Sequence, residues 1–195
     1  MKSKDHWEQV YSTKAADSVS WFEPHAETSM RLIRETGLSR DVAIIDVGAG
    51  ASTLVDDLLD DGYHHITLLD LSAAALAESE YRLGSRGSSI QWMVADITLA
   101  VFEPHSFDIW HDRAVFHFLT TDEAREKYVK QVLRALKPGG HVIMATFGAN
   151  GPTQCSGLPV MRYAPEALHA EFGNEFVLLK HEEQLHHTPF GTDQQ

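Results

Sequence analysis

The sequence Val42-Ala43-Ile44-Ile45-Asp46-Val47-Gly48-Ala49-Gly50 decides the fold class of this chain, and Ile66-Thr67-Leu68-Leu69-Asp70 extends the argument. Each stretch is a short apolar run with an acidic residue at or near its end, which is typical of a strand buried on both faces of a parallel sheet. The two glycines let the backbone approach a ligand closely where the strand turns into the next helix. The second acid is expected at the tip of the neighbouring strand, within reach of a ribose diol. The pattern therefore predicts a site for a nucleoside cofactor.

Strand-like and helix-like patterns alternate along the chain. The alternation predicts an α/β fold with a Rossmann-like, doubly wound and mostly parallel sheet that has helices on both faces. Expected strands cover residues 42–47, 65–71, 90–95, 107–111 and 141–147, and expected helices cover 53–61, 73–83 and 122–136. The last helix is the clearest, with Asp122 or Thr121 as its cap and Lys137-Pro138-Gly139-Gly140 as its stop. Further helices are expected at 4–11, 24–36 and 165–172, and a further strand at 176–181.

A chain of 195 residues is long enough for one domain with a sizeable core. We expect a single domain over 1–195, in which 1–37 form an N-terminal helical cover or lid and 38–147 form the cofactor-binding core. Residues 148–195 are expected to supply a loop on the substrate side and a C-terminal strand region. The loop at 148–159 is rich in Gly and Pro, and a loop of that length in a compact domain is usually functional.

Charge and cysteine content exclude several functional classes. The formal net charge is −12 with His neutral and no basic run is present, so a nucleic-acid backbone would be repelled. One cysteine, Cys155, rules out an internal disulfide and fits a reducing compartment. The first residues lack the apolar core of a signal peptide, and no apolar stretch could span a bilayer. We therefore expect a cytoplasmic protein without nucleic-acid or membrane partners.

The acid before the glycines distinguishes two classes of nucleoside cofactor. A dinucleotide-binding oxidoreductase uses G-x-G-x-x-G after its first strand, and here the third glycine position is Thr53. Asp46 would repel a pyrophosphate, whereas it suits a ligand that carries an ammonium group and a sulfonium group. The stretch therefore favours S-adenosylmethionine over a dinucleotide.

Several motifs in order carry a resemblance to a known family. They are Asp46-Val47-Gly48-Ala49-Gly50, Asp70 on the second strand, Ala95-Asp96-Ile97 after the third, and Leu136-Lys137-Pro138-Gly139-Gly140-His141 before the fifth. With these motifs the chain resembles the class I S-adenosylmethionine-dependent methyltransferases from about Ile33 onward. One departure is Ala51, where many members carry a third glycine, and alanine at a helix start costs little.

The resemblance implies a role for each matching residue. Asp46 and the backbone of Gly48, Ala49 and Gly50 would face the methionine portion of S-adenosylmethionine, and the product would be S-adenosylhomocysteine. Asp70 would bind the ribose hydroxyls, and Asp96 would accept a hydrogen bond from the adenine amino group. Leu71 and Ile97 would lie on the two faces of the adenine ring.

The fourth strand leads into Trp110-His111-Asp112-Arg113-Ala114-Val115-Phe116-His117-Phe118-Leu119. Ligands of open α/β sheets lie beyond the carboxyl ends of the strands, so His111 is expected beside both the cofactor and the acceptor. His111 and His117 are candidate bases and Arg113 is a candidate substrate anchor, with Arg113 and His117 on one face if the segment is helical. The alternatives are an ion pair between Asp112 and Arg113, and a His117 that only packs against aromatic rings.

The chain also resembles a narrower group of small, single-domain bacterial methyltransferases that carry this Trp-His-Asp-Arg-Ala-Val-Phe-His-Phe-Leu motif, for which the acceptor is unknown. The later Cys155-Ser156-Gly157-Leu158-Pro159-Val160 loop belongs to the same likeness. Fold-level relatives include eukaryotic protein-lysine methyltransferases, which share the early pattern of Trp7, Tyr11 and Trp21-Phe22. Fold alone does not decide between these acceptors.

Aromatic residues near the N-terminus predict a lid over the site. Tyr11, Trp21 and Phe22, with Trp7, would exclude water from the reaction, or would simply cover the sheet. Arg162 and Tyr163 are candidates for the opposite wall of the pocket, as are Gln154 and Cys155. A lone cysteine is more often a small apolar filler than a chemical group, and no histidine has metal-ligand spacing, so no metal is expected.

The resemblance implies a sheet that ends with an antiparallel pair of strands. Residues 176–181 can supply the first strand of that pair, and nothing after residues 188–192 can supply the second. We therefore expect either a sequence that is cut short or a sheet that lacks its last antiparallel strand. An exposed edge would invite pairing, so a monomer and a homodimer are both expected states.

These observations lead to one functional hypothesis and two alternatives. The hypothesis is S-adenosylmethionine-dependent methyl transfer to a small-molecule nucleophile (O, N or S), which can be anionic, by in-line displacement. The first alternative is a protein-lysine methyltransferase. The second is a cofactor-binding relative without catalytic activity, and a nucleic-acid methyltransferase is least favoured because of the charge balance.

Overall fold

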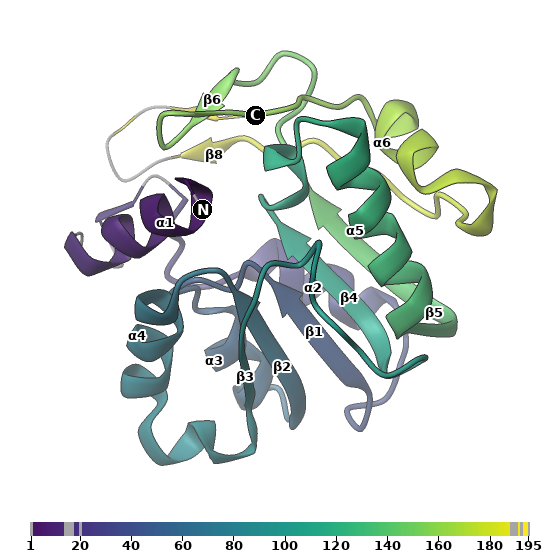
Figure 1. Ribbon diagram of the computed structural model, residues 1–195. Coiled ribbons are helices and arrows are strands. Elements are labelled where there is room, and N and C mark those ends of the chain that lie inside the picture. The colour runs from purple at the N-terminus through teal and green to yellow at the C-terminus, as the bar shows by residue number, and fades with distance from the viewer. Residues whose placement is uncertain (1, 14–17, 20, 188–190, 192, 195) are drawn as a thin grey trace.

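Five parallel strands form the central sheet, in the order β3-β2-β1-β4-β5 (Figure 1). The computed structural model describes residues 2–13, 18–19, 21–187, 191 and 193–194. The strands are β1 (Ala43–Val47), β2 (His65–Asp70), β3 (Gln91–Val94), β4 (Phe107–Arg113) and β5 (Leu136–Ala145). This arrangement confirms the predicted α/β class, because each of these strands overlaps one of the strands predicted from the sequence.

Helices cover both faces of the sheet. Ile44 of β1 and Ile109 of β4 pack with α2 (Glu27–Glu35), α3 (Leu54–Asp60) and α4 (Ala73–Leu83). The next residues along the same strands, Ile45 and Trp110, pack on the other face with α5 (Asp122–Ala135) and α6 (Pro165–Phe172). Because successive side chains of a strand point to opposite faces, the unbroken apolar runs supply two cores at once.

Smaller elements complete the described part of the chain. The first helix, α1 (Lys2–Thr13), lies against α4 near the end of the sheet that also carries the small hairpins (Figure 1). Short 3₁₀ helices cover Gly84–Ser89, Phe116–Phe118 and Gly173–Glu175. The hairpins are β6 (Gln154–Cys155) with β7 (Leu158–Pro159), and β8 (His186–His187) with β9 (Asp193–Gln194).

Side-chain caps fix the start of two helices. The Ser72 side chain accepts a hydrogen bond from the Ala75 backbone N–H at 3.1 Å, and the Thr121 side chain accepts one from Ala124 at 3.3 Å. Each cap satisfies a backbone donor that has no partner within its helix. Of the two residues expected to cap α5, Thr121 is therefore the cap and Asp122 is the first helical residue.

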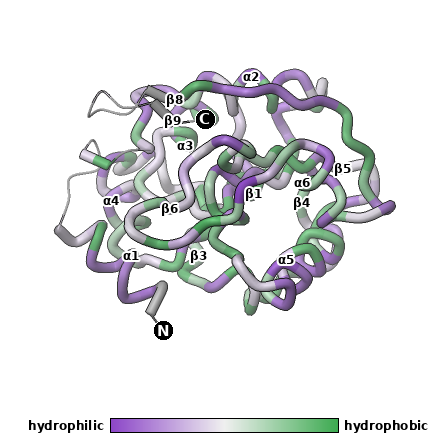
Figure 2. Tube along the Cα trace, turned by 90° about the horizontal axis from the view of Figure 1, so that it is seen from above, coloured by the Kyte–Doolittle hydropathy of each residue, from purple (hydrophilic) through white to green (hydrophobic). Residues whose placement is uncertain are grey.

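The strand order reverses at β1, which lies between β2 and β4. The connections from β1 to β3 pass over one face, and the connection from β4 to β5 passes over the other. Asp46 of β1 and His111 of β4 are directly opposite each other in this central pair. Seen from above in Figure 2, β1 lies at the centre, with α2 on one side and α5 on the other. The crevice at such a reversal point, at the carboxyl ends of the strands, is where open α/β sheets bind ligands.

A buried polar network stiffens the strand that leads into this crevice. The Trp110 indole N–H donates to the Tyr128 hydroxyl at 2.8 Å, and that hydroxyl donates to the Asp112 carboxylate at 2.5 Å. Asp112 also accepts from the Val115 and Phe116 backbone N–H groups, and burial raises its pKa to about 6. Asp112 therefore holds the turn after β4 and makes no ion pair with Arg113.

Replacing Tyr128 by phenylalanine removes the hydroxyl at the centre of this network. We expect the free energy of unfolding to fall by about 1–3 kcal/mol, because a buried indole N–H and a buried carboxylate each lose a partner. Urea denaturation measures the change, and Tyr81→Phe, at a largely exposed site on α4, is the matched control. Equal stability of Tyr128→Phe and the wild type would contradict the account of this network.

The predicted strand at 176–181 is wrong. These residues pair with no strand in the described part of the chain, and the Val177 and Leu179 side chains are 78% and 75% exposed. Lys180 and Glu182 instead make ion pairs with Glu35 and Arg31 of α2. The apolar run is typical of a strand, but the charged residues that follow it form ion pairs with α2, so the segment lies along the outside of that helix.

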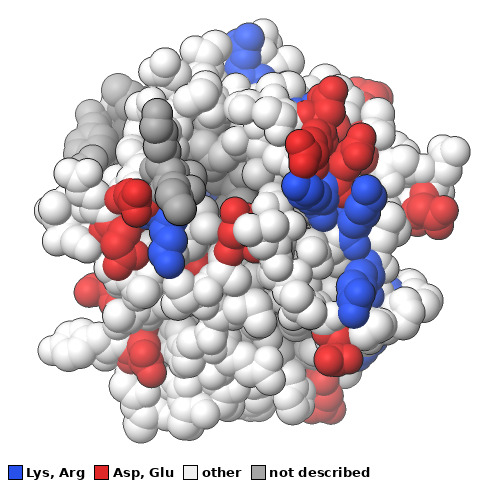
Figure 3. Space-filling view, in the orientation of Figure 1, with Lys and Arg blue, Asp and Glu red and all other residues white. Residues whose placement is uncertain are grey.

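The surface visible in Figure 3 mixes both signs of charge. Three ion pairs lie along α5, between Asp122 and Arg125, Glu123 and Lys127, and Glu126 and Lys130. Both partners of the second and third pairs are exposed, and such pairs contribute little to stability, whereas the Arg125 side chain of the first pair is buried. None of the helices in the described ranges combines the length and apolar character needed to cross a bilayer.

Candidate active site

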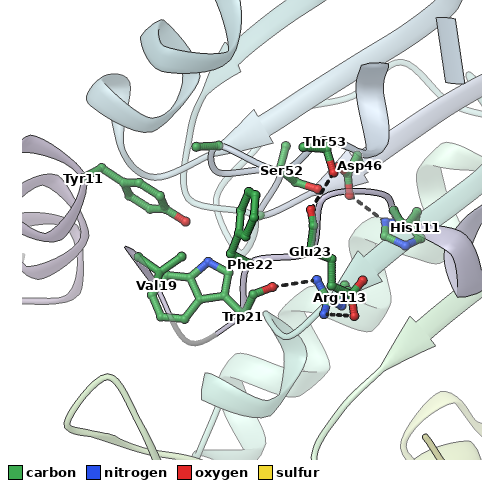
Figure 4. A pocket seen from close by; sticks show the side chains of 14 residues that line it. Tyr11, Val19, Trp21, Phe22, Glu23, Asp46, Ser52, Thr53, His111 and Arg113 are labelled. Carbon is green, nitrogen blue, oxygen red and sulfur yellow. Dashed lines mark hydrogen bonds and ion pairs between the residues drawn. The ribbon is translucent and has the colours of Figure 1, made fainter. Parts of the chain in front are cut away.

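A pocket opens at the carboxyl ends of β1 and β4, at the predicted crevice. Figure 4 shows side chains from the N-terminal segment facing those of the two strands across it. The pocket is lined by Tyr11, Val19, Trp21, Phe22, Glu23, Ala26, Asp46, Gly48, Ala49, Ala51, Ser52, Thr53, His111 and Arg113. Eight of the residues predicted for the site are among them, and they come from three distant parts of the sequence.

The glycine turn after β1 has a backbone conformation that favours glycine at two positions. Gly48 and Gly50 have φ angles of 71° and 55°. A Cβ atom on Gly48 would lie 1.9 Å from Val115 Cγ2, and one on Gly50 would lie 2.4 Å from the Tyr11 hydroxyl oxygen. The backbone of this turn is therefore closely approached by other groups, which is the property that a cradle for a ligand requires.

Asp70 fixes the glycine turn from the neighbouring strand. One carboxylate oxygen accepts a hydrogen bond from the Gly50 N–H at 2.9 Å, and the other accepts from the Ser72 N–H at 2.8 Å. Each oxygen retains a further lone pair for a donor such as a ribose hydroxyl. Burial raises the pKa of Asp70 to about 6 in spite of these hydrogen bonds.

Asp96, Leu71 and Ile97 lie outside the lining of the pocket, after β2 and β3. Asp96 is exposed, and one of its carboxylate oxygens accepts from the Thr98 N–H at 2.8 Å and the Thr98 hydroxyl at 2.7 Å. Its other oxygen has no hydrogen-bond partner shown among the described residues. These three residues follow β2 and β3, next to Asp70 along the edge of the sheet. The adenine base is expected to bind at this end of the site.

His111 is buried at the floor of the pocket with both ring nitrogens engaged. Its Nδ1 lies 2.6 Å from a carboxylate oxygen of Asp46, and its Nε2 lies 2.9 Å from the Ser29 hydroxyl oxygen. A base that acts on an acceptor needs a free lone pair directed at it. The contacts of His111 therefore favour a role in orienting Asp46 over the expected role as a direct base.

Arg113 is the last residue of β4 and is clamped to the N-terminal segment. Its guanidinium group donates to the Trp21 carbonyl oxygen at 3.1 Å and makes an ion pair with Glu23 at 2.8 Å. His117 lies in a separate 3₁₀ helix, so the two do not share a helical face as expected. Glu23 was not predicted as a site residue, although it directly follows Trp21 and Phe22.

His117 is fully buried and unusually placed. Its side chain is 0% exposed, and neither ring nitrogen has a hydrogen-bond partner among the described residues. The ring lies 4.5 Å from that of Phe118 and 4.9 Å from that of Phe147, measured between centroids. Burial lowers its pKa to about 4, because it disfavours the charged form, so the imidazole is neutral near pH 7.

The N-terminal helix lies over the site. The Glu8 carboxylate accepts from the Ala74 backbone N–H at 3.2 Å, which ties α1 to the start of α4. The ring of Trp7 is 5.6 Å from that of Trp21 and 5.3 Å from that of Phe118, and Tyr11 covers Gly50. Burial raises the pKa of Tyr11 well above its usual value near 10. This arrangement is the one expected of a lid.

Two residues expected in the opposite wall lie elsewhere. Tyr163 is buried in the core against Phe116 and Phe172, and Arg162 is exposed and donates to the Gly151 carbonyl oxygen at 3.2 Å. Burial raises the pKa of the Cys155 thiol to about 11, so it stays protonated at neutral pH. Among the described residues, no cluster of three or more His, Cys, Asp or Glu side chains could hold a metal ion.

Comparison with known proteins agrees with this geometry. Residues 44–140, which contain the glycine turn, Asp46, Asp70, Asp96 and the segment after β4, match the family model described as a methyltransferase domain. The chain is a class I S-adenosylmethionine-dependent methyltransferase domain. Its fold, the acidic glycine turn and the acids at the ends of β2 and β3 are those that the sequence resemblance implied.

Similar proteins differ in their acceptors. This methyltransferase is 28% identical over 141 residues to the eEF1A lysine and N-terminal methyltransferase of Mus musculus, a match that covers 72% of this chain and 20% of that protein. The chain thus spans about a fifth of that relative's length. A solved structure described as "Conversion of a Disulfide Bond into a Thioacetal Group during Echinomycin Biosynthesis" has a TM-score of 0.75 and 19% identity, covering 98% of this chain and 87% of that one.

A further solved structure carries the cofactor product. It is phosphoethanolamine N-methyltransferase 2 of Haemonchus contortus, in complex with phosphomonomethylethanolamine and S-adenosylhomocysteine, with a TM-score of 0.63 and 19% identity. The match covers 89% of this chain and 41% of that chain. At these identities the two structures show a shared fold and carry no assignment of the acceptor.

The shifted pKa of Asp70 predicts a pH dependence of cofactor binding. The ionised carboxylate is the form that accepts two ribose hydroxyls, and in the free protein it is lost as the pH falls through about 6. We expect the dissociation constant of S-adenosylhomocysteine to be about tenfold higher at pH 5 than at pH 7, since one pH unit below the pKa leaves about a tenth of the carboxylate ionised. Calorimetric titration across this range measures the effect.

Two variants control this prediction. Asp70→Asn should bind weakly at each pH with a flat profile, and Asp41→Asn, at an exposed site, should retain the wild-type profile. A wild-type affinity that is constant between pH 5 and pH 7 would show that the charge of Asp70 does not contribute to binding.

Proposed function

We propose that this protein transfers a methyl group from S-adenosylmethionine to a small-molecule O, N or S nucleophile. S-adenosylmethionine supplies an electrophilic methyl group on a sulfonium sulfur. The residues that would hold it are Asp46 and the Gly48–Gly50 backbone at the methionine portion, Asp70 at the ribose, and Asp96 with Leu71 and Ile97 at the adenine. In-line displacement needs alignment and exclusion of water more than covalent help from the protein.

The lid residues exclude water in this proposal. Tyr11, Trp7 and Trp21 form a continuous aromatic contact from α1 to the mouth of the pocket. Arg113 holds Trp21 and Glu23 in place, so we assign it a role in fixing the lid rather than in binding the acceptor directly. Burial of apolar rings over a charged reaction centre strengthens the electrostatic interactions inside it.

The single observation that carries the small-molecule assignment is the unpartnered imidazole of His117. A buried polar group without a partner costs about 1–3 kcal/mol, and such groups call for an explanation in ligand binding or catalysis. The Met161 N–H donates to the His117 carbonyl oxygen at 2.7 Å, so the loop after β7 closes over this residue. We assign His117 as the group that accepts a proton from the nucleophile, and the full burial of this residue favours a compact acceptor over a polypeptide.

The alternative acceptor is a protein lysine. It is favoured by the similarity to the mouse enzyme, whose name states that it modifies eEF1A lysine and N-terminal groups. The similarity covers 72% of this chain at 28% identity, and a shared fold at this level does not decide the acceptor.

Methyl transfer from radiolabelled S-adenosylmethionine tests the assignment. The purified protein would be incubated with pools of small thiols, amines, phenols and carboxylates, and separately with a denatured cell-protein mixture and lysine peptides. We expect label in the small-molecule fraction only. Label in the protein fraction would contradict a small-molecule acceptor and favour a protein lysine. Cofactor binding without transfer to any pool would favour a relative without catalytic activity.

A further inference from the structure

A chain of three buried side chains connects helix α2 to the floor of the pocket. The Ser29 hydroxyl oxygen lies 2.9 Å from His111 Nε2, and His111 Nδ1 lies 2.6 Å from Asp46 Oδ1. Ser29, His111 and Asp46 are 8%, 3% and 3% exposed. Ser29 stands 82 residues before His111, and no sequence pattern singles it out.

The hydrogen positions in this chain follow from the chemistry of its members. An ionised carboxylate only accepts hydrogen bonds, so the proton between His111 and Asp46 lies on Nδ1. In the neutral imidazole Nε2 is then an acceptor, and the Ser29 hydroxyl is the donor to it. Asp46 therefore selects the tautomer in which His111 donates to it, and the Ser29 hydroxyl anchors the other end of the ring by donating to Nε2.

The arrangement constrains the Asp46 carboxylate on one side. Asp46 and His111 are paired across β1 and β4, so their backbones are held by the sheet and only side-chain rotation is free. The hydrogen bond from His111 occupies Oδ1 and fixes that rotation. Asp46 also lines the pocket together with Gly48 and Ala49, so its orientation decides what the pocket offers to a cationic group.

We propose that Ser29 and His111 are positioning residues that orient the Asp46 carboxylate toward the ammonium group of the cofactor. The inference rests on the proposed role of Asp46 as a ligand of the methionine portion. Without the Ser29 hydroxyl, Nε2 is buried with no donor, and the imidazole ring is anchored at Nδ1 alone. The carboxylate then loses its fixed orientation although its charge remains.

The test combines a binding measurement with a spectroscopic one. Ser29→Ala is expected to weaken S-adenosylhomocysteine binding three- to tenfold, and Ser29→Thr, which keeps the hydroxyl, is expected to restore most of it. Long-range ¹H–¹⁵N spectra of the histidine rings in the free protein are expected to show protonated Nδ1 and a hydrogen-bonded Nε2 in the wild type. In Ser29→Ala the Nε2 signal is expected to shift to that of a ring nitrogen without a hydrogen bond, and the Nδ1–H signal to broaden because the ring is less firmly held. A merely structural role of Ser29 would leave the Nδ1–H signal of His111 unchanged.

A matched control separates this effect from general damage to α2. Thr36 is at the other end of the same helix, where its hydroxyl donates to the Ile33 carbonyl oxygen at 2.7 Å, so Thr36→Val should leave the affinity and the His111 signals unchanged. Equal affinity of wild type and Ser29→Ala, or an unchanged Nδ1–H signal of His111, would overturn the inference. If the wild type bound no S-adenosylhomocysteine, the proposed function would fail, and the spectra would still decide whether Ser29 fixes the imidazole.

Discussion

Replacing Asp46 by asparagine is expected to weaken the binding of S-adenosylhomocysteine by about 30- to 100-fold. The carboxylate lies in the pocket wall beside the glycine turn, and it is nearly excluded from solvent. Charge-assisted hydrogen bonds of buried groups are worth about 2–3 kcal/mol, and the amide loses the charge while it keeps the size of the side chain. Calorimetric titration of the variant gives the change directly.

Asp46→Asn also removes a hydrogen-bond partner of His111, so the stability of the variant needs a control. His111 would face an amide in place of a carboxylate, so the melting temperature of Asp46→Asn must be measured alongside the affinity. Asp41→Asn, on the surface before β1, should bind as the wild type does. A folded Asp46→Asn protein with wild-type affinity would show that the methionine portion of the cofactor lies elsewhere.

The second large effect is expected at His117, where function and stability should change in opposite directions. Leucine has a similar volume and no polar atom, so His117→Leu removes an unpartnered group from an apolar environment. We expect the free energy of unfolding to rise by about 1–2 kcal/mol and the turnover number to fall by about 10²- to 10⁴-fold. Urea denaturation gives the first quantity, and initial rates at saturating cofactor, with the acceptor that the screen identifies, give the second.

Cofactor affinity separates the possible causes of a loss of turnover. His117 lies outside the lining of the cofactor pocket, so His117→Leu should bind S-adenosylhomocysteine normally. His64→Leu, at an exposed site before β2, should change neither turnover nor affinity. Unchanged turnover in a stabilised His117→Leu protein would mean that the residue only packs against its aromatic neighbours, which the sequence left open as an alternative.

Local patterns predicted the fold because the forces that build it are local or strongly periodic. The runs that became β1, β2 and β4 are apolar on both faces, and Thr121 marks the start of α5. The helix ends at Ala135, and the stretch Lys137-Pro138-Gly139-Gly140, predicted as its stop, lies within β5. Residues 176–181 show where this reasoning fails. Their apolar run suits a strand, but strand formation depends on a partner, and the described residues provide none.

The site was predictable to the extent that it depends on strand ends. Asp46, Gly48 and Gly50 could be found because a parallel sheet brings the carboxyl ends of its strands together. Glu23, which lines the pocket, and Ser29, which contacts His111, could not, since each comes from a segment whose packing on the sheet has no signature in the sequence. The role of His111 depends on the same missing information, because only the contact with Ser29 reveals that both of its nitrogens are engaged.

The central claim is that the pocket at the carboxyl ends of β1 and β4 binds S-adenosylmethionine. Calorimetric titration of the purified protein with S-adenosylhomocysteine tests it most directly, with NAD as the control nucleotide. The account predicts one binding site per chain with a micromolar dissociation constant for S-adenosylhomocysteine and no binding of NAD. Binding of NAD alone would contradict it.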